Sequence, residues 1–108
     1  MATGIGITGR RGNALAVRTA KTAVGLLLQK NADVEVDRRF LRGHGSKPLS
    51  GFESGLIISF GGDGTLLETV RELKRGIPVL GINCGNRGFL QAYNHTELEE
   101  AILAVLGG

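Results

Sequence analysis

Two short apolar runs, separated by one amphipathic helix, constrain the fold of this chain more than any other feature. Residues 55–60 and 78–82 are rich in Ile, Leu and Val and carry no charge, which is typical of strands buried on both faces. Between them, residues 65–75 place apolar side chains at helical spacing, and Gly76 is a typical helix stop. A strand–helix–strand unit of this kind predicts a parallel sheet covered by helices.

The same alternation extends over the rest of the chain. The other predicted elements are a strand at residues 4–8, a helix at 14–30, a half-exposed edge strand at 33–37, a loop at 42–51, a second loop at 83–88, and a helix that a capping box opens at Thr96 and that runs to Leu106. A length of 108 residues suits one domain and is too short for two. We therefore expect residues 1–108 to form a single Rossmann-like α/β domain with a mainly parallel sheet flanked by helices.

The charge of the chain is unevenly distributed. Residues 1–52 hold nine Lys and Arg against three acids, a balance of +6, whereas residues 53–108 hold four against seven, a balance of −3. A basic first half suits the phosphate chain of a nucleotide, and it also suits nucleic acid. With only five aromatic residues and no interleaving of aromatic with basic residues, we expect no nucleic-acid partner.

The cellular setting follows from features that the sequence lacks. Cys84 is the only cysteine, so it forms no internal disulfide. No apolar stretch is long enough to span a bilayer, and the N-terminus has no signal-peptide core. We expect a cytoplasmic protein with no membrane partner.

The first glycines of the chain match a dinucleotide-binding fingerprint. Gly4, Gly6 and Gly9 fit the pattern G-x-G-x-x-G. The glycines of that fingerprint must follow a strand and open a helix, but only three residues precede Gly4. We interpret the match as accidental, and the roles of Arg10 and Arg11, at the carboxyl end of the strand, stay open.

The stretch Gly61-Gly62-Asp63-Gly64-Thr65 has the context that the first glycines lack. A buried strand leads into it and a helix leads out, and in open α/β sheets ligands bind beyond the carboxyl ends of the strands. Glycines there allow the backbone to approach a phosphate chain, and the amides at the helix N-terminus attract anions. Thr65 is expected either to cap the helix or to bond a phosphate oxygen.

Asp63 needs a separate explanation, because a carboxylate repels phosphate. It fits a residue that accepts the proton of an attacking hydroxyl, or orients it, in phosphoryl transfer, and it also fits a residue that holds Mg²⁺ through water. The alternative is a turn residue whose side chain bonds its own backbone amides. The neighbouring glycines, strand and helix favour the functional role.

The segments "GGDGTLLETV" and "PVLGINCGNRGFL" resemble the N-terminal domain of NAD kinases. Those enzymes transfer a phosphoryl group from ATP, or from polyphosphate in some members, to the 2′-hydroxyl of the adenosine ribose of NAD. The resemblance covers residues 55–90 well and the rest only by the order of the elements. GGDGT is shared with diacylglycerol-type lipid kinases, whose motif also has a Glu at the position of Glu68. The pattern LGIN-x-G-x-x-GFL, in contrast, is a feature of NAD kinases.

The resemblance implies a set of site residues. Asp63 activates or orients the 2′-hydroxyl, and the nucleotide site is lined by Gly61, Gly62, Gly64, Thr65, Asn83 and Gly85. It also implies Mg²⁺ with ATP, NAD as the substrate, and a homo-oligomer in the full-length protein. Arg87 departs from the family, which has an apolar residue at that position.

The family continues into a second, mostly β domain that these 108 residues do not supply, so we expect the isolated chain to be inactive alone. A lipid kinase domain and a non-catalytic nucleotide-binding module remain the alternatives. The phosphoryl donor and the choice between NAD and NADH stay open.

Three minor candidates remain. A basic cluster of Arg39, Arg42, His44 and Lys47 is interpreted as a solvated loop, with phosphate contact as the alternative. Cys84 is interpreted as a small buried filler, and His95 as a surface residue. No spacing of His, Cys and acidic residues suggests zinc.

Overall fold

A six-stranded parallel sheet organises residues 4–43, 45–73, 76–85 and 90–107, which are the residues that this computed structural model describes. The strands lie in the order β3-β2-β1-β4-β5-β6, and every neighbouring pair is parallel. The strands are β1 Ile5–Gly9, β2 Val34–Asp37, β3 Ser46–Lys47, β4 Leu56–Gly61, β5 Val79–Asn83 and β6 Tyr93–Asn94, and the helices are α1 Ala14–Gln29, α2 Asp63–Leu73 and α3 Leu98–Gly107, with short 3₁₀ turns at Leu49–Gly51 and His95–Glu97.

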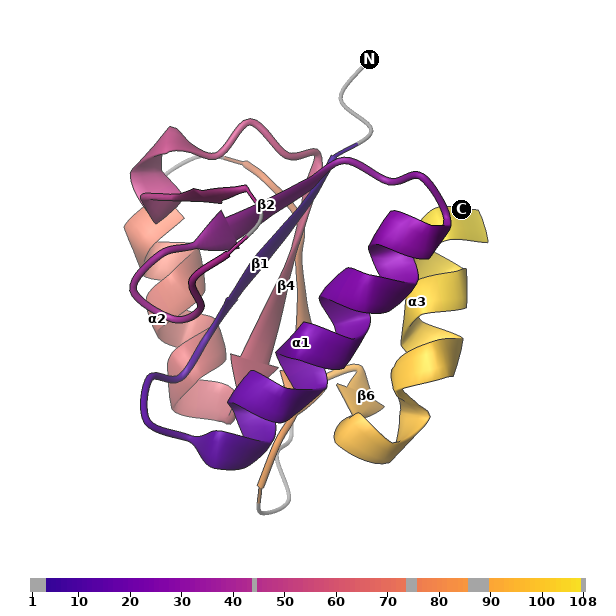
Figure 1. Cartoon of the computed structure of the whole chain (residues 1–108). Helices are drawn as coiled ribbons and strands as arrows, with labels where there is room; N and C mark the ends of the chain where they lie inside the picture. Colours follow the sequence, from indigo (N-terminus) through magenta and orange to yellow (C-terminus); the bar gives the residue numbers. More distant parts are fainter. Residues whose placement is uncertain (1–3, 44, 74–75, 86–89, 108) are drawn as a thin grey trace.

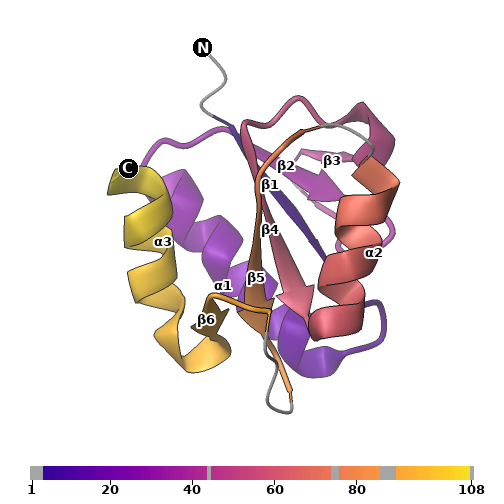
Figure 2. The same ribbon diagram turned by 180° about the vertical axis from the view of Figure 1, so that it is seen from behind.

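Helices cover both faces of this sheet. Helices α1 and α3 lie side by side on one face and α2 lies on the other, as Figures 1 and 2 show from opposite sides. Central strand β4 is buried on both faces: Ile58 and Phe60 join the core cluster that contains the α1 side chains, while Ile57 packs with Leu73 of α2. The expected Rossmann-like α/β architecture is confirmed. None of the described helices is long and apolar enough to cross a membrane.

Three sequence-based details differ from the structure. Helix α2 begins at Asp63, two residues earlier than expected, so Thr65 lies inside the first turn and does not cap the helix. Strand β2 is not at the edge, because the two-residue strand β3 pairs outside it. The capping box is formed by Asn94 and Glu97, not at Thr96, and it opens the 3₁₀ turn before α3.

The glycines of the apparent fingerprint are packing residues of β1. A Cβ atom on Gly6 would lie 2.6 Å from Cδ2 of Phe52, and one on Gly9 would lie 2.5 Å from the carbonyl oxygen of Phe60. Gly6 lies inside the strand, as expected, whereas Gly9, expected just after the strand, is the last residue of β1, so neither forms a phosphate-binding turn.

Glu35 of β2 ties together three segments of the chain. Its carboxylate accepts hydrogen bonds from the Glu53 and Ser54 amides, both at 2.8 Å, from the Ser54 hydroxyl, and from Nζ of Lys47 at 2.9 Å. Burial alone would raise the pKa of Glu35, but the bonds from Ser54, Lys47 and the Glu53 amide outweigh burial and lower it below 4.5.

Replacing Glu35 by Gln is expected to lower the free energy of unfolding at pH 7 by about 1–3 kcal/mol, as hydrogen bonds to a charged group are lost. Because folding lowers this pKa, the stabilisation is present above the unfolded value and disappears as the pH falls through the folded one. Urea unfolding at pH 7 and near pH 3 measures both effects. The matched control is Glu53→Gln, whose side chain is 88% exposed, and an equal loss in both variants would contradict the role of Glu35.

Candidate functional site

The ends of three neighbouring strands bring the sequence-predicted site residues together. In the order β1-β4-β5, Gly61 lies opposite Asn83, and the Cys84 amide donates to the Gly61 carbonyl at 3.0 Å. The chain runs outward from β1 to β3 and then returns to β4, so the connections reverse direction between β1 and β4. In α/β sheets such a switch point is where ligands bind, beyond the carboxyl ends of the strands.

Asp63 is the first residue of α2 and its carboxylate is half-exposed. Oδ1 accepts a hydrogen bond of 3.1 Å from the backbone amide of Leu90, which belongs to the segment that follows β5. The carboxylate is therefore anchored by an amide 27 residues away in the chain. A negative charge at a helix N-terminus is also favourable, because the first amides of the helix point toward it.

The three glycines beside Asp63 have different environments. A Cβ atom on Gly61 would lie 2.7 Å from Oγ1 of Thr65, so this glycine allows β4 to pack against α2. A Cβ atom on Gly62 or Gly64 would meet no atom within 4 Å. The backbone at Gly62 and Gly64 thus borders open space, which an approaching phosphate group requires.

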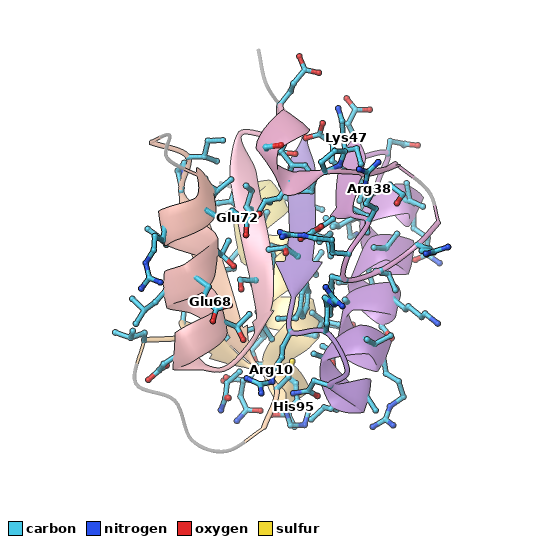
Figure 3. All side chains as sticks on the ribbon, turned by 90° about the vertical axis from the view of Figure 1, so that its left-hand side faces the viewer. Arg10, Arg38, Lys47, Glu68, Glu72 and His95 are labelled. Carbon is cyan, nitrogen blue, oxygen red and sulfur yellow. The ribbon has the colours of Figure 1, made fainter. Side chains whose placement is uncertain are left out.

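A cavity of about 440 Å³ lies at the switch point, between the end of β1 and α2, and we call it the switch-point cavity. Its walls include Arg10 and Arg11 from the loop after β1, and Thr65, Glu68 and Glu72 from α2. Figure 3 views this side, with Glu68 and Glu72 on α2 and Arg10 beyond the end of β1. The volume is within the range of small-molecule sites.

The sequence did not identify Asp37, the last residue of β2, as part of this cavity. Its buried carboxylate accepts a 2.8 Å hydrogen bond from the Thr8 hydroxyl and a 3.1 Å bond from the Arg39 amide. Arg39 also pairs with Glu72 of α2, and its hydrogen bond to Asp37 raises the pKa of the guanidinium further. This arginine is therefore charged and fixed between β2 and α2.

Asn83 has an unpaired polar atom. The residue is 7% exposed, and among the described residues its Oδ1 has no hydrogen-bond partner. A cavity of about 380 Å³ lies beside it, with Gly85 and Gln91 among the lining residues. A buried acceptor next to a cavity is available to a donor group of a ligand. His95 was expected at the surface, but it is half-buried, with Nδ1 3.3 Å from the Asn83 carbonyl oxygen.

Of the remaining candidates Cys84, Arg87 and His44, the structure describes Cys84. Cys84 is buried, as predicted, and burial raises the pKa of its thiol. Arg87 and His44 lie outside the described residues. Within the described ranges no three His, Cys, Asp or Glu side chains gather to hold a metal ion.

Sequence comparison relates this chain to one group of enzymes. A family model for the ATP-NAD kinase N-terminal domain matches residues 46–108. Proteins named NAD kinase from Pseudomonas putida (strain W619) and from Marinobacter nauticus are 42% and 39% identical over 112 residues. Both alignments cover 96% of this chain, which spans only 38% of the length of those relatives.

Solved structures give the same result at the level of the fold. Yeast NADH kinase complexed with NADH superposes with a TM-score of 0.79 at 18% identity, over 98% of this chain and 38% of the yeast chain. An NAD kinase from Archaeoglobus fulgidus in complex with ATP superposes with a TM-score of 0.64 at 26% identity, over 94% of this chain and 36% of the other.

Proposed function

Because this chain belongs to the NAD kinase family, we propose that it is the nucleotide-binding part of an enzyme that phosphorylates the 2′-hydroxyl of NAD. ATP is the proposed donor, with polyphosphate as the alternative donor. The observation that carries the proposal is the Asp63 carboxylate, held by the Leu90 amide beside the open backbone of Gly62 and Gly64. The two named structures contain NADH and ATP, which supports a dinucleotide acceptor and a nucleotide donor.

In the proposed reaction, Asp63 orients the 2′-hydroxyl and accepts its proton as the oxygen attacks the γ-phosphorus of ATP, whose bond to the β,γ-bridging oxygen breaks to release ADP. The hydrogen bond from Leu90 keeps the carboxylate oxygen in place for that task. The amides of Gly62 and Gly64 and the N-terminus of α2 bind phosphate oxygens, and Arg10 and Arg11 offset their negative charge. Catalysis then depends mainly on positioning and on charge stabilisation.

The donor and the acceptor occupy opposite sides of Asp63 in this proposal. The donor phosphates enter the switch-point cavity, where Thr65 supplies a hydroxyl and the arginines supply charge. The acceptor lies on the β5 side, where Asn83 offers its unpaired Oδ1 and Gly85 lines the neighbouring cavity. Mg²⁺ enters as part of the ATP substrate, since magnesium is usually bound by one or two carboxylates together with substrate phosphates.

A lipid kinase is the alternative enzyme, and an acceptor assay separates the two. NAD and diacylglycerol, each offered with ATP and Mg²⁺, distinguish the two enzymes, because only the true acceptor gives a phosphorylated product.

We propose a homo-oligomeric, cytoplasmic enzyme with NAD as its acceptor.

The 108-residue chain alone is expected to bind ATP or NAD in a calorimetric titration without forming measurable NADP. Its residues offer one side of a cleft, and phosphoryl transfer requires donor and acceptor to be fixed in line. Adenosine, which has no phosphates, is the control ligand. The absence of nucleotide binding would contradict the proposed function. Rapid turnover by the isolated chain would show that phosphoryl transfer needs no residues beyond these 108.

A further inference from the structure

A groove of about 750 Å³ lies between α1 and α3, on the face of the sheet opposite α2. It shares no lining residue with the switch-point cavity. We call it the helix groove, and its walls include Arg18, Thr22 and Leu26 of α1 and Glu100 of α3. Figure 1 shows the two helices side by side, both running away from the edge of the sheet that carries the candidate site.

The outer sides of the two helices carry opposite charges. Arg18 and Lys21 on α1 are exposed, and so is Glu100 on α3. Arg18 and Glu100 line the same groove, but within the described ranges neither of them forms an ion pair, and Lys21 forms none either. The basic charge of α1 and the acidic charge of α3 are therefore not neutralised inside one chain, and both are available to a partner.

An apolar side chain adjoins the acidic charge of α3. Leu103 is 58% exposed and lies three residues after Glu100, so the two share the outer side of that helix. On α1, Thr22 is exposed, and its hydroxyl already donates to the Arg18 carbonyl oxygen at 3.1 Å. A Cβ atom on Gly25, three residues later, would meet no atom within 4 Å. A leucine from outside can therefore pack on this part of α1 without burying an unpaired polar group.

A second copy of this chain has the complementary arrangement. A two-fold axis along the helix groove, parallel to the two helices, places α1 of each copy opposite α3 of the other without a shift along the helices. We propose that the helix groove is the centre of a homodimer interface, in which Arg18 of each copy faces Glu100 of the other. Leu103, about one turn farther along α3, then packs against Thr22 and Gly25.

The symmetry of this interface strengthens it, because every contact across a two-fold axis occurs twice. Both charge pairs and both leucine contacts thus form in the same step. The inference rests on the proposed function for the expectation of a homo-oligomer, but not for the choice of this face.

Sedimentation velocity of the 108-residue chain, from micromolar to millimolar concentrations, tests the interface. The unmodified chain is expected to dimerise with a dissociation constant that rises with salt. Arg18→Glu or Glu100→Lys alone creates two contacts between like charges and should weaken the dimer at least about 10-fold. The matched controls, Arg38→Glu and Glu53→Lys, make the same charge changes at exposed positions outside the helix groove and should change dimerisation less than about 2-fold.

Mixing the two reversed variants separates charge pairing from other effects of the substitutions. In a heterodimer of Arg18→Glu with Glu100→Lys, both helix contacts again join opposite charges, whereas each variant alone pairs like charges. We expect the equimolar mixture, and the double variant Arg18→Glu/Glu100→Lys, to recover the unmodified dissociation constant to within about 3-fold. Thermal unfolding of each variant verifies that these exposed substitutions leave the fold intact.

Four results would overturn the interface. They are a chain that stays monomeric, controls that weaken the dimer as much as the reversed variants, a mixture of folded variants that does not dimerise, and reversed variants that dimerise normally. The last result would point instead to α2, where Leu67 and Val70 are 50% and 53% exposed. Asp63→Asn should dimerise like the unmodified chain, so failure of the kinase proposal and failure of the interface can be told apart.

Discussion

Replacing Asp63 by Asn is expected to lower kcat for NADP formation by about 10²–10⁴-fold, the range typical of a lost general base. Asparagine has nearly the same shape, and its Oδ1 can still accept the hydrogen bond from the Leu90 amide. The segment after β5 thus stays attached while the proton acceptor is lost. The measurement is steady-state NADP formation by the natural polypeptide that contains these residues, because the chain spans only 38% of its relatives.

Substrate binding distinguishes a chemical role of Asp63 from a structural one. Removal of a negative charge beside phosphate-binding amides should not weaken ATP binding, so KM for ATP is expected to stay the same or fall while kcat drops. Glu99→Gln, which removes one exposed acid from α3, is the control and should retain full activity. The role assigned to Asp63 fails if Asp63→Asn keeps more than about one-tenth of the activity, or if ATP binding and thermal stability are lost together.

The elements that carry the site could be predicted from the sequence because each has a strong local signal. Residues 55–60 and 78–82 are rich in apolar residues and carry no charge, and strands β4 and β5 lie within one residue of those ranges. The glycine-rich segment at residues 61–65 directly follows residues 55–60 in the chain. Chain connectivity therefore places it at the carboxyl end of a strand. Gly61 and Asn83 then face each other because the two strands are neighbours in the sheet.

Other parts of the site depend on contacts that no local pattern reveals. Strands β3 and β6 have two residues each, too few to show a period of two, so the edge position of β2 was misassigned. A basic cavity of about 710 Å³, lined by Arg11, Arg38, Arg39 and Arg42, requires Arg11 to meet a turn 27 residues later in the chain, beginning at Arg38. The sequence showed an excess of basic residues there, but only the pairing of β1 with β2 shows which of them share a hollow.

The three glycines around Asp63 are expected to respond differently to alanine. Gly61→Ala places a methyl group 2.7 Å from Oγ1 of the buried Thr65, so we expect a loss of about 1–3 kcal/mol in the free energy of unfolding. Gly62→Ala and Gly64→Ala meet no atom within 4 Å, and at Gly64, inside α2, alanine should stabilise the helix by about 0.5–1 kcal/mol. Urea unfolding of the three variants measures this contrast.

Nucleotide affinity should show the reverse order. If the bare backbone at residues 62 and 64 receives phosphate oxygens, a methyl group there occupies their space, and ATP affinity in a calorimetric titration should fall about 10-fold in these well-folded variants (about 1.4 kcal/mol). Gly12→Ala is unsuitable as a control because its φ of 78° would strain alanine, whereas Gly25→Ala on α1 also meets no atom within 4 Å and lies far from the site in the fold. A packing defect would lower the free energy of unfolding. A variant that keeps this free energy but loses ATP affinity therefore indicates that the methyl group blocks the ligand. Unchanged ATP affinity in both Gly62→Ala and Gly64→Ala would mean that the open space beside Asp63 is not where the phosphates lie.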